Sequence, residues 1–173
     1  MDEVPFLRRD QEIDRHGSKL PHWQQGTAVL FITFRLADSI PVAKWRELKR
    51  LKAAWIRHHG GGWDMKEARR IHRWLDAGHG SCALRCPEMR RPVEDTLLHR
   101  DGSDYHLLAA VVMPNHVHAL VSPFPTQSLP SMVGAWKSVS SRRIAKHGDW
   151  CGWQRNYHDR LIRDKRHFRR VVR

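Results

Sequence analysis

The sequence predicts an α+β fold in which an antiparallel sheet carries helices on one face. Two observations predict it. Short apolar stretches rich in β-branched and aromatic residues have the composition of strands, and longer stretches place apolar residues at helical spacing. These elements follow the order strand, helices, two strands, helix, strand, helix, which is typical of a sheet covered by helices. The 173 residues suffice for one domain with a substantial core.

The first half of the chain is expected to contain one strand and three helices. Residues 1–20 are interpreted as a flexible basic arm, and residues 21–173 as the folded domain. The stretch AVLFITFRL, residues 28–36, reads as a buried strand. Trp45, Leu48, Leu51 and Trp55 then follow at spacings of three, three and four, which predicts one face of a helix. Two further helices are expected, one ending at Gly78 and a shorter one over 87–98.

The second half is expected to supply the rest of the sheet. Residues 105–113 (YHLLAAVVM) are apolar on both faces, which predicts a central strand. Pro114 and Asn115 interrupt it, and residues 116–121 (HVHALV) are expected to return beside it. A helix is predicted over 128–147, an extended segment over 153–162, and a last helix from Asp164.

Composition favours a polyanionic partner. Lys and Arg number 31 against 18 Asp and Glu, a formal charge of +13, and the pI is about 10.6. Residues 142–173 alone hold eleven basic and three acidic residues, interleaved with aromatic residues, a pattern suited to single-stranded nucleic acid. No stretch approaches the roughly 18 apolar residues of a membrane helix, so no membrane association is expected. Three cysteines fit a reducing compartment and a cytoplasmic location.

The sharpest local feature is the pair His116 and His118. Alternate residues of a strand project from the same face, so both imidazoles should point one way while Val117, Ala119 and Val121 enter the core. Two neutral imidazoles side by side form half of a metal site. A His-x-His pair on an exposed strand is by itself more often a surface feature, and the chain holds thirteen histidines.

Five ordered blocks between residues 18 and 173 carry a family resemblance. They are LPHWQQGTAVLFITFRLADSIP, WLDAGHGSCALRCPEMR, VVMPNHVHALV, SLPSMVGAWKSVSSRRI and WQRNYHDRLIRDKRHFRRVVR. Together they resemble the REP-associated tyrosine transposases, a branch of the HUH single-strand transposases with an IS200-like domain. The resemblance implies a ferredoxin-like sheet with the HUH motif, here His116 and His118, on a central strand.

The resemblance also implies a chemistry. In that family the two histidines hold Mg²⁺ or Mn²⁺ at the scissile phosphate of hairpin-forming single-stranded DNA. A tyrosine then attacks in line and leaves a 5′-phosphotyrosine and a free 3′-hydroxyl. The partner implied is single-stranded or hairpin DNA, and the sequence leaves open whether the chain forms a homodimer. A non-catalytic protein that recognises the same DNA is the alternative.

The nucleophile is the point of departure from the family. The family tyrosine lies on the last helix, directly after a stretch like HFRRVVR, so the expected catalytic helix is incomplete at Arg173 and its metal ligand is also absent. The sequence contains only Tyr105 and Tyr157. Tyr105 is expected to pack, and Tyr157 is the one candidate for a substitute nucleophile.

Other residues are candidates for supporting roles. Asn115 can brace a histidine ring or simply occupy the turn. Lys137 and Ser138 resemble family residues that face DNA, but a polar pair facing solvent explains them equally well. Trp153 and Gln154 can meet a base, although Trp153 is more simply expected to pack beneath the sheet. The candidate phosphate contacts are Arg142, Arg143, Arg155, Arg160 and Arg163, together with Lys137.

Two further readings stay open. His79, Cys82 and Cys86 form a loose string of zinc-type ligands that lacks an evident fourth member. An RNA-binding module on a similar sheet is the other, but the chain lacks the aromatic-rich signature of such modules on a central strand.

Overall fold

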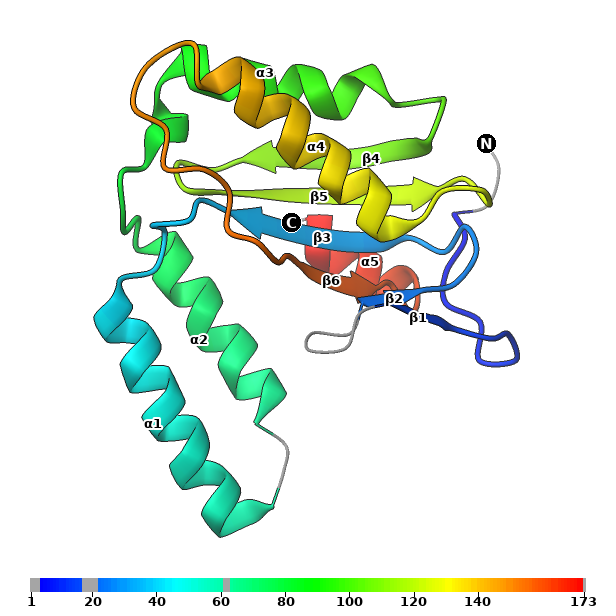
Figure 1. Ribbon diagram of the computed structural model, residues 1–173. Helices are drawn as coiled ribbons and strands as arrows, with labels where there is room; N and C mark the ends of the chain where they lie inside the picture. The colour runs from blue at the N-terminus through cyan, green and yellow to red at the C-terminus, as the bar shows by residue number, and fades with distance from the viewer. Residues whose placement is uncertain (1–3, 17–21, 61–62, 173) are drawn as a thin grey trace.

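A four-stranded antiparallel sheet forms the centre of the protein. The computed structural model describes residues 4–16, 22–60 and 63–172. The sheet has the order β4-β5-β3-β6 (Figure 1), with bounds β3 Leu30–Arg35, β4 Tyr105–Val112, β5 His116–Pro123 and β6 His158–Leu161. Helices connect β3 to β4 and β5 to β6. The two middle strands of the sheet are β5 and β3. This is the ferredoxin-like arrangement, and the α+β prediction is confirmed. The prediction of a central strand for residues 105–113 is wrong, because β4 lies at the edge of the sheet.

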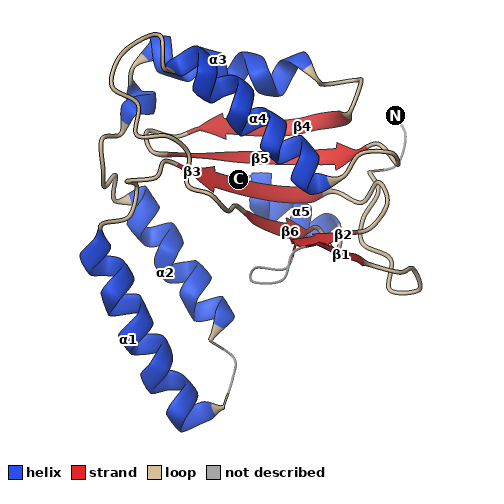
Figure 2. Cartoon of the chain, viewed as in Figure 1, coloured by secondary structure: helices blue, strands red, loops and turns tan. Residues whose placement is uncertain are grey.

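Two helices cover one face of the sheet. They are α3, Pro87–His99, and α4, Leu129–Ile144, and α4 crosses the sheet in Figure 2. Their apolar side chains join those of β3 and β5 in the main core, where Val117 and Val121 are fully buried. The side chains predicted to point inward from the His-x-His strand therefore do so.

The opposite face is also covered in part, which corrects the expectation of helices on one face only. The last helix α5, Lys165–Val172, lies behind the sheet in Figure 2. Phe168 and Val171 of α5 pack against a second, smaller cluster built on Val29, Leu120 and Ile162. Helix α5 packs on this face because its apolar side chains contact the strand side chains that point away from α3 and α4.

Two helices form an arm that projects from the body of the domain (Figure 1). They are α1, Val42–His59, and α2, Asp64–Asp76. Within the arm, Arg70 forms an exposed ion pair with Glu47, and the Lys44 ammonium lies 5.6 Å from the centre of the Trp74 ring. No helix of the described residues is long and apolar enough to cross a membrane.

The N-terminal residues pack on the domain, which corrects their interpretation as a flexible basic arm. Residues 1–20 hold four Lys and Arg against five Asp and Glu, so the segment is not basic. Phe6 contacts the second cluster, and the Leu7 amide donates to the Ile162 carbonyl at 3.0 Å. A short hairpin of β1 (Asp14–His16) and β2 (His22–Gln24) follows. Residues 1–3 and 17–20 of that expected arm lie outside the described residues.

A buried tyrosine ties the sheet to both covering helices. Tyr105 at the start of β4 is fully buried. Its hydroxyl donates to the Leu97 carbonyl of α3 at 2.6 Å and accepts from the Trp136 indole of α4 at 2.9 Å. Both partners would be left unsatisfied in the core without that hydroxyl. Tyr105 is therefore structural, as the sequence predicts.

Removing the Tyr105 hydroxyl should destabilise the fold. We expect Tyr105→Phe to lower the free energy of unfolding by about 1–3 kcal/mol, because two buried partners lose their hydrogen bonds. Urea denaturation followed by tryptophan fluorescence measures this. Tyr157→Phe is the matched control, since the Tyr157 hydroxyl is buried without a hydrogen bond among the described residues. Equal losses in the two variants would contradict the assignment.

Candidate functional site

The two imidazoles of β5 meet on the face of the sheet that α5 partly covers. The Nε2 atoms of His116 and His118 lie 3.0 Å apart. Phe31 of β3, part of the second cluster, stacks on the His118 ring with centroids 5.1 Å apart, which fixes the face. His116 is almost fully buried, and His118 is partly exposed. Strand alternation has therefore placed both rings on one side, opposite the core formed with α3 and α4.

A neighbour holds the other nitrogen of each ring. The Nδ1 of His116 lies 2.8 Å from the Asn115 Oδ1, and the Asn115 amide nitrogen donates to the His79 carbonyl at 3.0 Å. Because Oδ1 only accepts, His116 carries its proton on Nδ1 and leaves the Nε2 lone pair free. His118 Nδ1 lies 2.8 Å from the Thr33 hydroxyl, which can donate or accept and so supports either tautomer.

Burial keeps both rings neutral. It lowers the pKa of His116 to about 4 and that of His118 to about 3, and neighbouring imidazoles lower the pKa of His118 further. Both rings are therefore unprotonated at neutral pH, as a metal ligand must be. Without an ion, His118 can donate from Nε2 to the lone pair of His116.

The donor set fits a divalent cation. Two nitrogens 3.0 Å apart, each about 2.1 Å from an ion, would subtend an angle of about 90°, the angle between adjacent ligands of an octahedral ion. Asn115 and Thr33 orient the rings in the manner of outer partners in metal sites. Among the described residues, however, no three His, Cys, Asp or Glu side chains are already grouped closely enough to hold an ion.

Sequence reasoning missed two histidines beside this pair. His72 of α2 stacks near His118 with centroids 5.8 Å apart, and it meets His158 of β6 edge-on at 6.3 Å. Burial lowers the pKa of both. The positions of His72 and His158 in the sequence do not indicate this site, because the contacts of His72 with His118 and His158 join segments far apart in the sequence. A cavity of about 140 Å³ adjoins His118, lined by Phe31, Leu120 and Val171 among others.

Tyr157 lies on the wrong face to serve as a substitute nucleophile. Its side chain packs with the main core and stacks on His22 at 3.9 Å between ring centres. Burial and then the charge of Asp159 raise the pKa of its hydroxyl. A hydroxyl that resists ionisation and faces away from the histidine pair does not support the predicted catalytic role.

Lys137 is bound within the protein rather than presented to solvent. Its ammonium donates to the carbonyls of Gln154, Arg155 and Asn156 at 3.0–3.2 Å. Burial lowers its pKa to about 8. Lys137 therefore fixes the segment that leads into β6, and this geometry does not support its prediction as a DNA contact. Trp153 packs on Phe34 and donates to the Ser140 hydroxyl, so it too is structural.

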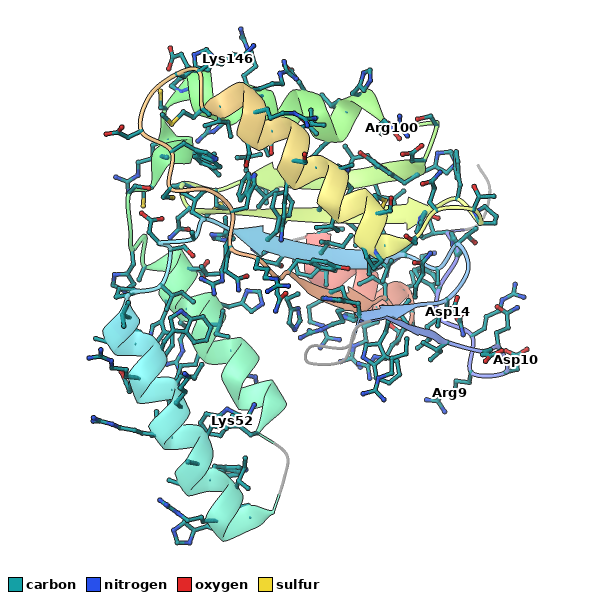
Figure 3. All side chains as sticks on the ribbon, in the orientation of Figure 1. Arg9, Asp10, Asp14, Lys52, Arg100 and Lys146 are labelled. Atoms are coloured by element: carbon teal, nitrogen blue, oxygen red, sulfur yellow. The ribbon has the colours of Figure 1, made fainter. Side chains whose placement is uncertain are left out.

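The five candidate arginines are all exposed but do not share one surface. Arg160 pairs in register with Phe31 on β6, which places it on the histidine face, and its charge lowers the pKa of His72. Arg143 instead bonds Asp95 of α3 at 2.7 Å, on the outer side of the two covering helices. Lys146, near Arg143, lies far from the arm in Figure 3. Arg163 lies nearer to Arg160, since its amide donates to His167, whose pKa the charges of both arginines lower.

The described cysteines do not form a zinc site. The Cys82 thiol donates to the Gly78 carbonyl at 3.2 Å, and the Cys86 thiol to Glu88 at 2.6 Å. No group of metal-ligating side chains in residues 4–16, 22–60 and 63–172 includes them. The open reading of His79, Cys82 and Cys86 as zinc ligands is therefore not supported.

Comparison with known proteins finds a similarity in the segment that holds the histidine pair. Residues 98–166 match the family described as transposase, IS200-like, and they include β4, β5, α4 and β6. Over this segment the chain is similar to the IS200-like transposases. A search of curated protein sequences finds no match.

Two solved structures resemble this chain. One is a REP-associated tyrosine transposase bound to a REP hairpin, with 12% identity and a TM-score of 0.49, covering 90% of this chain and 68% of that one. The other is a candidate transposase from Deinococcus radiodurans, with 15% identity and a TM-score of 0.42, covering 92% of each chain.

The buried histidine pair should make stability depend on pH. The pKa of each ring is lower in the folded chain than the ordinary 6.5. Below about pH 6.5 the unfolded chain therefore binds protons at these two rings that the folded chain does not bind. The free energy of unfolding should therefore fall as the pH drops from about 6.5 toward 4. Urea titrations at pH 7, 6 and 5 measure this.

Replacing one ring should reduce that dependence. His118→Asn should show a shallower fall than the wild type, whereas His99→Asn, at an exposed position, should match the wild type. A steep fall of equal size in His118→Asn would show that other groups cause it.

Proposed function

We propose that this protein is a member of the REP-associated branch of the transposases that binds hairpin-forming single-stranded DNA. In this proposal, Nε2 of His116 and Nε2 of His118 hold a divalent cation, Mg²⁺ or Mn²⁺, beside a DNA phosphate. The observation that carries the proposal is the 3.0 Å approach of these two nitrogens, with Asn115 and Thr33 on the far nitrogens. When bound, such a cation stabilises the negative charge that builds on a phosphate during strand transfer.

Charge near the histidine pair supports a nucleic-acid partner. Arg160 lies on the same face of the sheet, and α5 adds Arg166, Arg169 and Arg170 beside it. The arm brings α1, whose 18 residues hold six Lys and Arg against one acidic residue, and Lys52 of this helix is labelled in Figure 3. Basic residues on the face of the sheet that carries a partly exposed imidazole pair suit a phosphate backbone.

The two tyrosines of this sequence leave strand cleavage without a nucleophile at the site. Tyr105 and Tyr157 both pack in the main core, on the face opposite the histidines. Attack on a phosphate held beside His118 would need the oxygen within a few ångströms of the phosphorus. We therefore favour, for these 173 residues, recognition of DNA with a bound cation over formation of a phosphotyrosine by either residue.

DNA binding should depend on the histidine face and not on the outer side of the covering helices. Arg160→Gln should weaken binding of a labelled hairpin oligonucleotide several-fold and reduce its salt dependence, because one phosphate contact is lost. Arg143→Gln, on the opposite side, is the matched control and should bind as the wild type does. Fluorescence anisotropy in Mn²⁺ buffer across a series of salt concentrations measures both.

Three outcomes would count against this account. Hairpin affinity that does not vary with salt would exclude phosphate recognition. Equal affinity for an RNA hairpin of the same sequence would favour the RNA-binding reading. A covalent protein–DNA adduct that disappears in Tyr157→Phe would show that Tyr157 does reach the phosphate.

A further inference from the structure

The last turn of α2 carries a carboxylate one helical turn after the histidine that stacks near His118. His72 and Asp76 are four residues apart on this helix, so they share one of its faces. The His72 ring stacks near His118, with centroids 5.8 Å apart and planes 24° apart. The face of α2 that carries Asp76 therefore looks toward the two imidazoles.

Two contacts with the sheet lie on either side of Asp76 in the sequence. Four residues before it, the His72 ring stacks near His118, and three residues after it the His79 carbonyl accepts from the Asn115 amide. Asp76 itself is exposed, which leaves its side chain room to turn.

The residues directly after Asp76 are hydrogen-bonded to Asn115, the residue just before β5. The His79 carbonyl, three residues on, accepts from the Asn115 amide whose oxygen holds His116. Next to it, the Ser81 amide donates to Asp38 at 2.6 Å. At Gly80, with φ +85°, a Cβ would lie 2.6 Å from the Asp38 carbonyl oxygen, so only glycine fits this close approach. The end of α2 is therefore held beside the pair by the same residue that orients His116.

Helix stability does not explain an acidic residue at this position. The last turn of a helix carries a partial negative charge, and a carboxylate there is unfavourable. Asp76 is the last residue of α2, where the favoured charge is positive. A metal ligand would explain its presence, because Mg²⁺ and Mn²⁺ prefer oxygen ligands and the two imidazoles supply none.

We propose that Asp76 turns inward and supplies an oxygen ligand to the divalent cation held by His116 and His118. This inference rests on the proposed function, since it requires that the histidine pair binds a cation. It assigns the third protein ligand to the projecting arm, so that occupation of the site would fasten α2 to the sheet. The contact of His72 with His118 holds α2 near the sheet.

Direct Mn²⁺ binding to the full chain tests the inference. Free Mn²⁺ is followed by electron paramagnetic resonance during titration of the wild type, Asp76→Asn, His118→Ala and the matched control Asp149→Asn, at another exposed aspartate. We expect Asp76→Asn to raise the Kd at least about tenfold, Asp149→Asn to leave it within about twofold, and His118→Ala to abolish binding. Without metal, Asp76→Asn should unfold at the same or a higher temperature than the wild type.

High salt separates a ligand from a distant charge. In about 1 M KCl the Debye length is about 3 Å, so a carboxylate that acts only through space loses its effect, whereas a bound ligand keeps it. Equal Kd values for Asp76→Asn and Asp149→Asn in high salt, with binding still lost in His118→Ala, would overturn this inference and leave the proposed function standing. Absence of Mn²⁺ binding by the wild type would overturn both.

Discussion

The two-residue period of strand β5 is the constraint on which the site depends. It sends Val117, Ala119 and Val121 into the core and His116 and His118 to the other face, so packing of the first set fixes the position of the second. A shift of one residue in the pairing of β5 with β3 would bury the imidazoles under α3 and α4. The hydrophobic effect thus sets the geometry of a polar pair that it does not itself stabilise.

A second constraint is which ring nitrogen of each histidine carries a proton. Asn115 fixes one tautomer of His116, while the Thr33 hydroxyl accepts either tautomer of His118. The pair can share a proton when alone and present two lone pairs to an ion. Burial supports both states because it keeps the rings neutral. The two imidazoles are therefore paired with each other in the absence of an ion, which is compatible with the proposed metal binding.

The sequence predicted what local pattern controls, and it failed where distant segments meet. Helical spacing located α1, α2 and α4, and alternation in residues 116–121 placed both histidines on one face. The burial of Lys137 could not be foreseen, because its three carbonyl partners lie 17 to 19 residues further along. The approach of His72 to His118 and the packing of α5 behind the sheet likewise depend on tertiary contacts that no periodicity records.

A crystal soaked in Mn²⁺ and measured by anomalous diffraction gives the most direct test of the central claim. The account predicts one strong anomalous peak about 2.1–2.2 Å from the Nε2 atoms of both His116 and His118. A fully occupied ion elsewhere, with the two nitrogens still 3.0 Å apart and sharing a proton, would contradict it.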